Sequence, residues 1–223
     1  MNKIAILMRG PIRPNIESVL SKAILIKEEI SKKTDSVDIF ISTWKEDGID
    51  YSSLISSPII NNIFILSKPS QEEVIKKIGF PNLKQGYPTY NAYLQYYMCR
   101  FALKTIKNYK NYDFIVHSRT DLSISFGEHI EKWFSPNIYK TIHISDRHLG
   151  GAGFTNDQFA IATTDNMIKA WDYETIDHLR VLMEYANIPE NILEGIMAKN
   201  NVIAEQTPFN SWELDPNRHS VAA

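Results

Sequence analysis

Cysteine is nearly absent from this sequence: its 223 residues contain one, Cys99. A single thiol can form neither an intrachain disulfide nor a zinc site built from cysteines. Disulfides belong to oxidising compartments, so we expect a cytoplasmic protein. Cys99 lies in an apolar stretch typical of a buried helix face, which favours a core role over a nucleophilic one.

Long hydrophobic runs are missing as well. The apolar run at residues 4–8 is shorter than the ~7–15 residues of a signal-peptide core. No run approaches the ~18 apolar residues of a membrane span. We therefore expect no membrane-spanning segment, and the sequence leaves open a peripheral association with the inner membrane surface.

Neither sign of charge dominates the sequence. Lys and Arg total 24 against 26 Asp and Glu, which gives a net charge of −2. Nucleic-acid-binding domains usually carry a strong basic excess, so nucleic acid is excluded as the main partner. Glycine and proline, 9 and 10 residues, are too few for a disordered or collagen-like chain, and we expect a folded core.

Several nucleotide and metal motifs are also lacking. The sequence has no Gly-x-x-x-x-Gly-Lys-Ser/Thr, no Gly-x-Gly-x-x-Gly after an expected strand and no His-Glu-x-x-His. These absences argue against a P-loop enzyme, a dinucleotide dehydrogenase and a zinc protease of that type. The glycine-rich loop at 146–154 lacks the phosphate-binding lysine, and it fits either a flexible connection or an active-site flap.

What is present is an alternation of short apolar segments with longer amphipathic ones. Residues typical of strands occur at 3–9, 38–43, 62–66, 112–118, 138–145, 157–162 and 202–205. Helical spacing of apolar residues occurs at 15–33, 70–78, 89–107, 166–173, 173–185 and 190–199. This order predicts an α/β fold with a Rossmann-like, mostly parallel sheet flanked by helices. The ligand is expected beyond the carboxyl ends of the strands.

The segment 112–121 carries the clearest chemical signal. Its apolar strand ends in Arg119 and Asp121, whose side chains lie on the same side by strand alternation. A carboxylate there can hold Mg²⁺ or Mn²⁺ while the metal and the guanidinium neutralise a diphosphate leaving group. An Arg–Asp pair that merely closes the strand end explains the spacing equally well.

Five segments, taken in order, resemble those of a known family. They are 3–11 (KIAILMRGP), 38–44 (DIFISTW), 95–102 (QYYMCRFA), 112–122 (YDFIVHSRTDL) and 156–162 (NDQFAIA). Together they resemble the WavE-type lipopolysaccharide and capsule biosynthesis proteins, which look like GT-A glycosyltransferases. The resemblance extends over roughly the first three quarters of the chain.

The resemblance implies one GT-A-like domain over 1–223. Its nucleotide-sugar-binding half would be 1–122 and its acceptor half 123–214, while the tail 215–223 is expected to be frayed. The implied activity is transfer of a hexosyl or related sugar from a nucleotide-sugar donor to a hydroxyl of a glycan or lipid-linked glycan acceptor, such as lipopolysaccharide or capsule. Two other interpretations stay open: a non-catalytic nucleotide- or sugar-binding module of a glycan-assembly complex, and a metal-dependent phosphohydrolase.

GT-A enzymes hold a divalent metal with an Asp-x-Asp triplet at a strand end. The corresponding triplet here is Arg119-Thr120-Asp121. The resemblance therefore implies Asp121 as a ligand of Mn²⁺ or Mg²⁺. Because Arg119 replaces the first acid and can do part of the metal's electrostatic work, metal dependence is left open.

The same resemblance implies a lining for the nucleotide pocket. Arg9 and Gly10 would line it at the end of the first strand, and Thr43 and Trp44 at the end of the second. Trp44 fits either stacking on a base or a place in the core. Arg100, on the long helix, fits either a phosphate contact or a side chain that snorkels to the surface.

An inverting transfer needs a base for the acceptor hydroxyl. Asp157 is the first candidate, because it follows the glycine-rich loop and matches an Asp-Gln of the acceptor half in the resembling proteins. Glu190 and Glu194, one helical turn apart, come next, although a solvated helix start explains Glu190 as well. His117, between apolar neighbours, fits a buried histidine better than a base. His148, in the glycine-rich loop, is a weaker candidate for a sugar contact.

Overall fold

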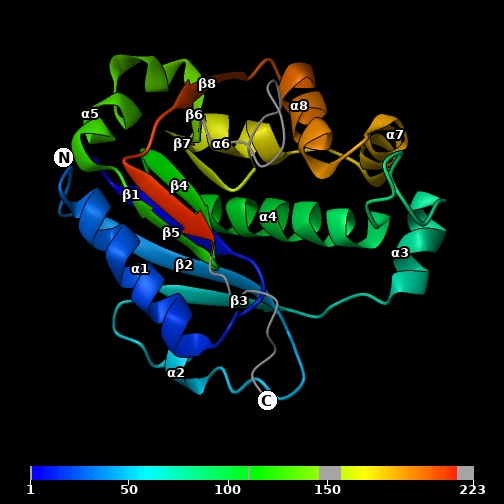
Figure 1. Cartoon of the computed structure of the whole chain (residues 1–223), viewed down its shortest axis with the longest axis horizontal. Helices are drawn as coiled ribbons and strands as arrows, with labels where there is room; N and C mark the ends of the chain where they lie inside the picture. Colours follow the sequence, from blue (N-terminus) through cyan, green and yellow to red (C-terminus); the bar gives the residue numbers. More distant parts are fainter. Residues whose placement is uncertain (1, 110, 146–156, 215–223) are drawn as a thin grey trace.

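The structure, a computed structural model, describes residues 2–109, 111–145 and 157–214. Its centre is a seven-stranded sheet with the order β3-β2-β1-β4-β7-β6-β8 (Figure 1). The strands are β1 (Ile4–Arg9), β2 (Val37–Trp44), β3 (Asn62–Leu66), β4 (Phe114–Arg119), β6 (Thr141–Ser145), β7 (Phe159–Thr163) and β8 (Ile203–Thr207). The first four strands pair in parallel, β7 runs antiparallel to both of its neighbours, and β8 is parallel to β6. The predicted α/β fold with a mostly parallel sheet is confirmed.

The sequence of β1 explains its central place in the sheet. All six of its residues are buried, as expected for a strand covered on both faces. Successive side chains point to opposite faces. Ile4, Ile6 and Met8 therefore pack into one hydrophobic cluster, and Ala5 and Leu7 pack into the other.

Helices cover both faces of this sheet (Figure 1). The cluster that contains Ile6 is covered by α1 (Ile16–Ser31), α2 (Ser52–Ile55) and α5 (Ile130–Trp133). The cluster that contains Leu7 is covered by α3 (Gln71–Ile78), α4 (Thr89–Tyr109), α6 (Thr164–Trp171), α7 (Ile176–Tyr185) and α8 (Pro189–Lys199). A small antiparallel sheet of β5 (Leu122–Ser125) and β9 (Ser211–Leu214) lies beside α1.

Helix α4 is 21 residues long and its buried side forms the middle of the core. Cys99 lies on this side and is fully buried. Burial raises the pKa of the Cys99 thiol to about 12, so the thiol stays protonated, and the predicted core role is confirmed. Neither α4 nor any other helix of the described residues combines the length and the apolar character that a bilayer span requires.

Three predicted strand starts are wrong by two or three residues, and the first of them, expected at 112, lies at Phe114. The strand expected from 138 begins only at Thr141, because Pro136–Tyr139 form a 3₁₀ turn in which the Lys140 amide donates to the Asn137 carbonyl at 2.8 Å. Proline at the first position of such a turn favours it, because its φ is already fixed near the helical value. The sequence predicts a strand that begins at Asp157, but β7 begins at Phe159. Asp157 therefore lies outside the ladder, at the entrance to the strand.

Candidate functional site

A cleft of about 380 Å³ opens at the carboxyl ends of β1, β2, β3 and β4. This is the sheet edge where ligands bind in open α/β folds. One side of the cleft is a stripe of α4 at helical spacing, made by Asn91, Leu94, Gln95 and Met98. The strand ends and the loops that follow them contribute the remaining lining residues, Arg9, Gly10, Pro11, Arg13, Trp44, Glu46, Lys68, Tyr87, Arg119 and Asp121.

Positive charge dominates this cleft. Its lining contains the cations Arg9, Arg13, Lys68 and Arg119 and the acids Glu46 and Asp121. Each of these two acids is bound to an arginine of the lining: the Arg13 guanidinium donates to Glu46 at 2.6 Å, and that of Arg119 donates to Asp121. An excess of cationic donors suits a phosphate-bearing ligand.

Arg9 and Arg119 are direct neighbours in the sheet, because the two residues pair in register between β1 and β4. Like charges at such positions repel each other unless acids compensate them. Arg119 has Asp121, and Arg9 has Asp157, with 3.4 Å between the Arg9 Nη2 and the Asp157 Oδ2. The two arginines are thus held side by side by two separate carboxylates.

The Arg119–Asp121 contact is a bidentate ion pair. Arg119 Nε donates to Asp121 Oδ1 at 2.7 Å, and Nη2 donates to Oδ2 at 2.6 Å. Burial lowers the pKa of Arg119, but the hydrogen bonds and charge of Asp121 outweigh it and leave that pKa above its ordinary value. Arg119 therefore remains a cation at every relevant pH.

Arg9 is locked into a buried network under the cleft. Its Nε donates to His117 Nε2 at 2.8 Å, and its Nη2 donates to the main-chain oxygen of Asp157 at 2.8 Å. The guanidinium also lies 5.2 Å from the ring centre of Trp171. Burial, followed by the charges of Arg9 and Arg119, lowers the pKa of His117 well below its ordinary value. His117 is therefore a neutral, buried acceptor, as the sequence favours.

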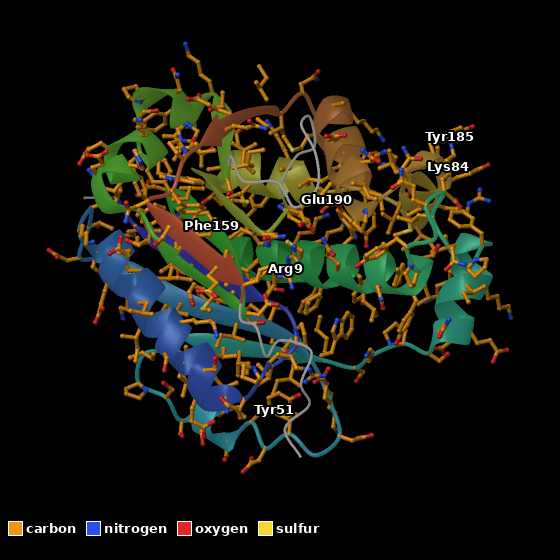
Figure 2. All side chains as sticks on the ribbon, viewed as in Figure 1. Arg9, Tyr51, Lys84, Phe159, Tyr185 and Glu190 are labelled. Atoms are coloured by element: carbon orange, nitrogen blue, oxygen red, sulfur yellow. The ribbon has the colours of Figure 1, made fainter. Side chains whose placement is uncertain are left out.

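Asp157 and Glu190 meet beside this network. Asp157 is 6% exposed, and its carboxylate accepts hydrogen bonds from Arg9 and from the Gln95 amide. Burial, followed by the charge of Asp157, raises the pKa of Glu190 at the start of α8. Burial and the charges of Asp157 and Glu190 likewise raise the pKa of Tyr87. Figure 2 shows Arg9 and Glu190 close together in the view, in agreement with their electrostatic interaction.

Gly10 allows the loops after β1 and β4 to approach each other. Its φ is +136°, and an added Cβ would lie only 2.7 Å from the Thr120 hydroxyl oxygen. Thr120 ties the loops together, because its amide donates to the Arg9 carbonyl at 3.0 Å and its hydroxyl donates to the Pro11 carbonyl at 2.7 Å. A glycine at this position therefore brings Arg9 and Arg119 to one wall of the cleft.

The structure places other predicted site residues away from the cleft lining. Thr43 is buried, and its hydroxyl donates to the Trp44 carbonyl over a long 3.5 Å. Arg100 donates to Asp172 and to the Glu174 carbonyl, both at 2.7 Å, so it clamps α4 to the segment after α6.

The remaining predicted residues have other surroundings. Trp44 lines the cleft but is 4% exposed and stacks on Tyr97, with 6.1 Å between ring centres. Glu194 accepts from the Asn191 amide at 3.1 Å. His148 and the glycine-rich loop lie outside the described residues.

Sequence reasoning missed part of the cleft. Arg13 and Lys68 each follow a strand by a few residues, so a search of every strand end for cations would have found them. Asn91 and Gln95 lie four residues apart on a helix whose pattern indicates only a core role. Their polar side chains on an otherwise apolar face were the available signal.

The residues of this cleft do not fit a resident divalent metal. Such ions require several oxygen ligands. Across the described ranges, no group of three or more His, Cys, Asp or Glu side chains is placed to hold a metal ion. Both oxygens of Asp121 already accept from Arg119, and Glu46 is bound to Arg13. The role of Asp121 as a ligand of Mn²⁺ or Mg²⁺ stays a prediction from the sequence.

No family model matches this sequence, and no curated protein matches it. Among solved structures, a protein assigned as a nucleotide-diphospho-sugar transferase from Desulfovibrio desulfuricans G20 covers 93% of this chain and 80% of its own, at 10% identity and a TM-score of 0.51. The match to mouse xyloside xylosyltransferase 1 extends over 92% of this chain and 84% of the mouse chain, at 10% identity and a TM-score of 0.45. The match to the galactosyltransferase LgtC, solved with donor and acceptor sugar analogues, extends over 90% of this chain and 72% of LgtC, at 14% identity and a TM-score of 0.46.

Identities this low show a shared fold alone. Of these three likenesses, that to the Desulfovibrio desulfuricans protein has a TM-score above 0.5, and it extends over most of both chains. The chain therefore shares the α/β fold of that protein, and the predicted GT-A-like fold is confirmed.

Proposed function

We propose that this protein is a glycosyltransferase that moves a sugar from a nucleotide-sugar donor to a hydroxyl of a surface glycan, such as lipopolysaccharide or capsule. The observation that carries the proposal is the cationic cleft at the carboxyl ends of the four parallel strands of a GT-A-like sheet. Its volume of about 380 Å³ lies within the range of small-ligand pockets. Arginine side chains at its wall suit the diphosphate of a nucleotide sugar.

The division of the chain into two halves is part of this proposal. Among the residues that the structure describes, those that line the cleft lie between positions 9 and 121, which supports a donor-binding half at 1–122. Asp157 and Glu190 come from the half at 123–214 and lie at the edge of the same charged region. This arrangement suits an acceptor that approaches from the second half.

The contacts favour Glu190 over Asp157 as the base of an inverting transfer. The Asp157 carboxylate holds two donors, Arg9 and Gln95, so its part is to position the buried network. Within the described residues, no other side chain is hydrogen-bonded to the Glu190 carboxylate. Its raised pKa also brings it nearer to neutral pH, where a general base works best. We assign Glu190 as the base and Asp157 as a positioning residue.

The finer parts of the proposal rest on the sequence resemblance. They are membership of the WavE-type family, a surface glycan as acceptor, a cytoplasmic location and peripheral association with the inner membrane surface. A donor half built around the end of β1 and the Arg119–Asp121 strand end is consistent with the segments that carry the resemblance.

A donor panel tests the proposal. The purified protein is incubated with UDP-, GDP- and CMP-sugars and with glycan acceptors extracted from bacterial surfaces, and free nucleotide and glycosylated product are measured by mass spectrometry. We expect one donor class to be consumed, with an equal amount of product formed. Nucleotide binding without any consumption would favour the non-catalytic binding module, and the absence of both would contradict the proposal.

A further inference from the structure

The strand end where the sequence predicts a metal ligand holds an enclosed acid and a more exposed cation. The side chain of Asp121 is 5% exposed, whereas that of Arg119 is 30% exposed. Both Asp121 oxygens accept from the Arg119 guanidinium, at 2.7 and 2.6 Å. The guanidinium is therefore the part of the pair that a ligand in the cleft meets.

This pairing leaves Asp121 little capacity to bind a second cation. A metal ion on the carboxylate would have to displace the guanidinium or share the oxygens with it, and the two positive charges would repel each other. The other acid of the lining, Glu46, accepts from Arg13 at 2.6 Å. In the parts of the chain that the structure describes, no group of three metal-ligating side chains replaces them.

The cations of the lining supply the charge that a metal would otherwise bring. Arg13 and Lys68 line the cleft together with Arg119. Lys68 lies 5.8 Å from the ring centre of Tyr90 and forms no ion pair with an acid of the described residues. Guanidinium forks and ammonium groups bind phosphate oxygens directly, so these three side chains match the two phosphates of a nucleoside diphosphate.

We propose that Arg119 takes the place of the divalent metal as the main contact of the donor diphosphate, and that Asp121 is a positioning residue that orients Arg119. This inference rests on the proposed transferase function. In the transfer, the acceptor oxygen bonds to the anomeric carbon while the bond from that carbon to the diphosphate oxygen breaks. The electron pair of the broken bond goes to the diphosphate, where Arg119 stabilises it, and the acceptor proton goes to Glu190.

Isothermal titration calorimetry tests the inference with UDP, GDP and CMP as probes, in EDTA and separately in excess Mn²⁺. We expect at least one nucleoside diphosphate to bind in EDTA with the affinity that it has in Mn²⁺. Arg119→Ala should weaken this binding about 10- to 100-fold, because charged hydrogen bonds to the phosphate are lost. Arg119→Lys keeps the charge but loses the bidentate geometry of the guanidinium, so its affinity should lie between those of the wild type and Arg119→Ala. Arg180→Ala, which removes an exposed arginine of α7, is the matched control and should change nothing.

A double-mutant cycle separates positioning from metal binding. Arg119→Ala leaves an enclosed carboxylate unpaired, so the double variant Arg119→Ala/Asp121→Asn is measured beside it. If Asp121 acts through Arg119, then Asp121→Asn weakens binding in the wild-type background and no longer weakens it when Arg119 is already alanine. Circular dichroism of each variant shows whether it is folded.

The outcomes distinguish this inference from the function on which it rests. Binding or turnover that requires Mn²⁺ and is lost in Asp121→Asn would overturn the inference and leave the transferase proposal standing. Failure of all the nucleotides to bind in either buffer would overturn both.

Discussion

Glu190 and Asp157 show, at the scale of single residues, how two carboxylates in one neighbourhood acquire different roles. Asp157 is enclosed and bonded to Arg9 and Gln95, which stabilise its charge. Among the described side chains Glu190 has no such donor, and burial together with the charge of Asp157 raises its pKa. An acid that keeps its proton more readily is suited to exchange it with a substrate, whereas a paired acid is suited to hold its partners in place.

Glu190→Gln is expected to lower the transfer rate by about 10²–10⁴-fold, because it removes the general base. In the wild-type protein the rate should rise with pH as Glu190 loses its proton, and the raised pKa places this rise above the pH range of an ordinary glutamate. Measurement of kcat against pH checks both points. Glu184→Gln, at an exposed position of α7, is the matched control. An unchanged rate in Glu190→Gln would remove Glu190 from the mechanism.

Glu190→Gln is expected to lower the transfer rate but to raise the stability of the folded protein at neutral pH. Because the Glu190 pKa is higher in the folded state, folded protein binds more protons than unfolded chain once the pH exceeds the ordinary value of 4.5. The contribution of Glu190 to stability therefore falls as pH rises through this window and stays unfavourable above it. Urea denaturation should show Glu190→Gln to be more stable than wild type at neutral pH and similar to it below pH 4.5. A loss of stability at neutral pH would contradict the burial of this carboxylate.

Asp157→Asn is expected to destabilise the protein by about 3 kcal/mol, since it leaves the buried charge of Arg9 without its acid. Chemical denaturation followed by circular dichroism measures this loss. Asp177→Asn provides the control, because Asp177 is paired with Arg180 at an exposed position and should matter by less than about 0.5 kcal/mol. Equal, small effects of the two substitutions would show that Asp157 does not hold Arg9.

At the scale of elements, the site depends on how the ends of β1 and β4 meet. Gly10 and Thr120 let the two loops touch, and the register then sets Arg9 beside Arg119. The stripe of α4 that ends near Met98 closes the other side of the cleft. The cleft is thus made by the crossing of one helix over the ends of parallel strands.

Gly10→Ala is expected to destabilise the protein by about 1–3 kcal/mol, because its φ is unfavourable for alanine and its Cβ would collide with the Thr120 hydroxyl. Nucleotide affinity should fall with it, since the loops must separate. Gly48→Ala is the control for a positive φ without a collision, because Gly48 has φ +79° and a Cβ added there would meet no atom within 4 Å. In the double variant Gly10→Ala/Thr120→Ala the hydroxyl that the new Cβ meets is absent, so part of the lost stability should return. Equal unfolding free energies for Gly10→Ala and Gly48→Ala would contradict the close approach.

Much of the fold could be predicted from the sequence, because apolar runs such as that of β1 and the capping box of Ser70 and Glu73 are local signals. The strand end after 112–118 therefore indicated Arg119 and Asp121 as candidate site residues, and the family resemblance added Arg9. An ion pair of Arg119 with Asp121 was one of the two interpretations of the sequence, and the structure contains it. The place of Arg9 beside Arg119 could not be predicted, since it depends on the register between β1 and β4. The small sheet of β5 and β9 was missed for a similar reason: its two strands are short and lie far apart in the sequence, so no local signal pairs them.

At the scale of the whole molecule, two halves of the chain meet at one charged region. Of the described residues, the proposed donor half supplies the cleft lining, and the proposed acceptor half supplies Asp157 and Glu190. Arg9 joins the halves, since its side chain extends from the end of β1 to Asp157, just before β7. A ligand that binds the cleft therefore contacts residues that are tied into both halves of the core, and its binding should stabilise the molecule as a unit.

The most direct test is the unfolding midpoint of the protein with and without UDP, GDP, CMP and their sugar conjugates, for wild type and Arg119→Ala. A ligand at ~100 times its dissociation constant adds roughly 2.7 kcal/mol, which gives a clear rise in the midpoint. We predict that one nucleotide class raises the midpoint of the wild-type protein and that Arg119→Ala loses most of this rise. A midpoint that no nucleotide changes would contradict a nucleotide-sugar site in the cleft.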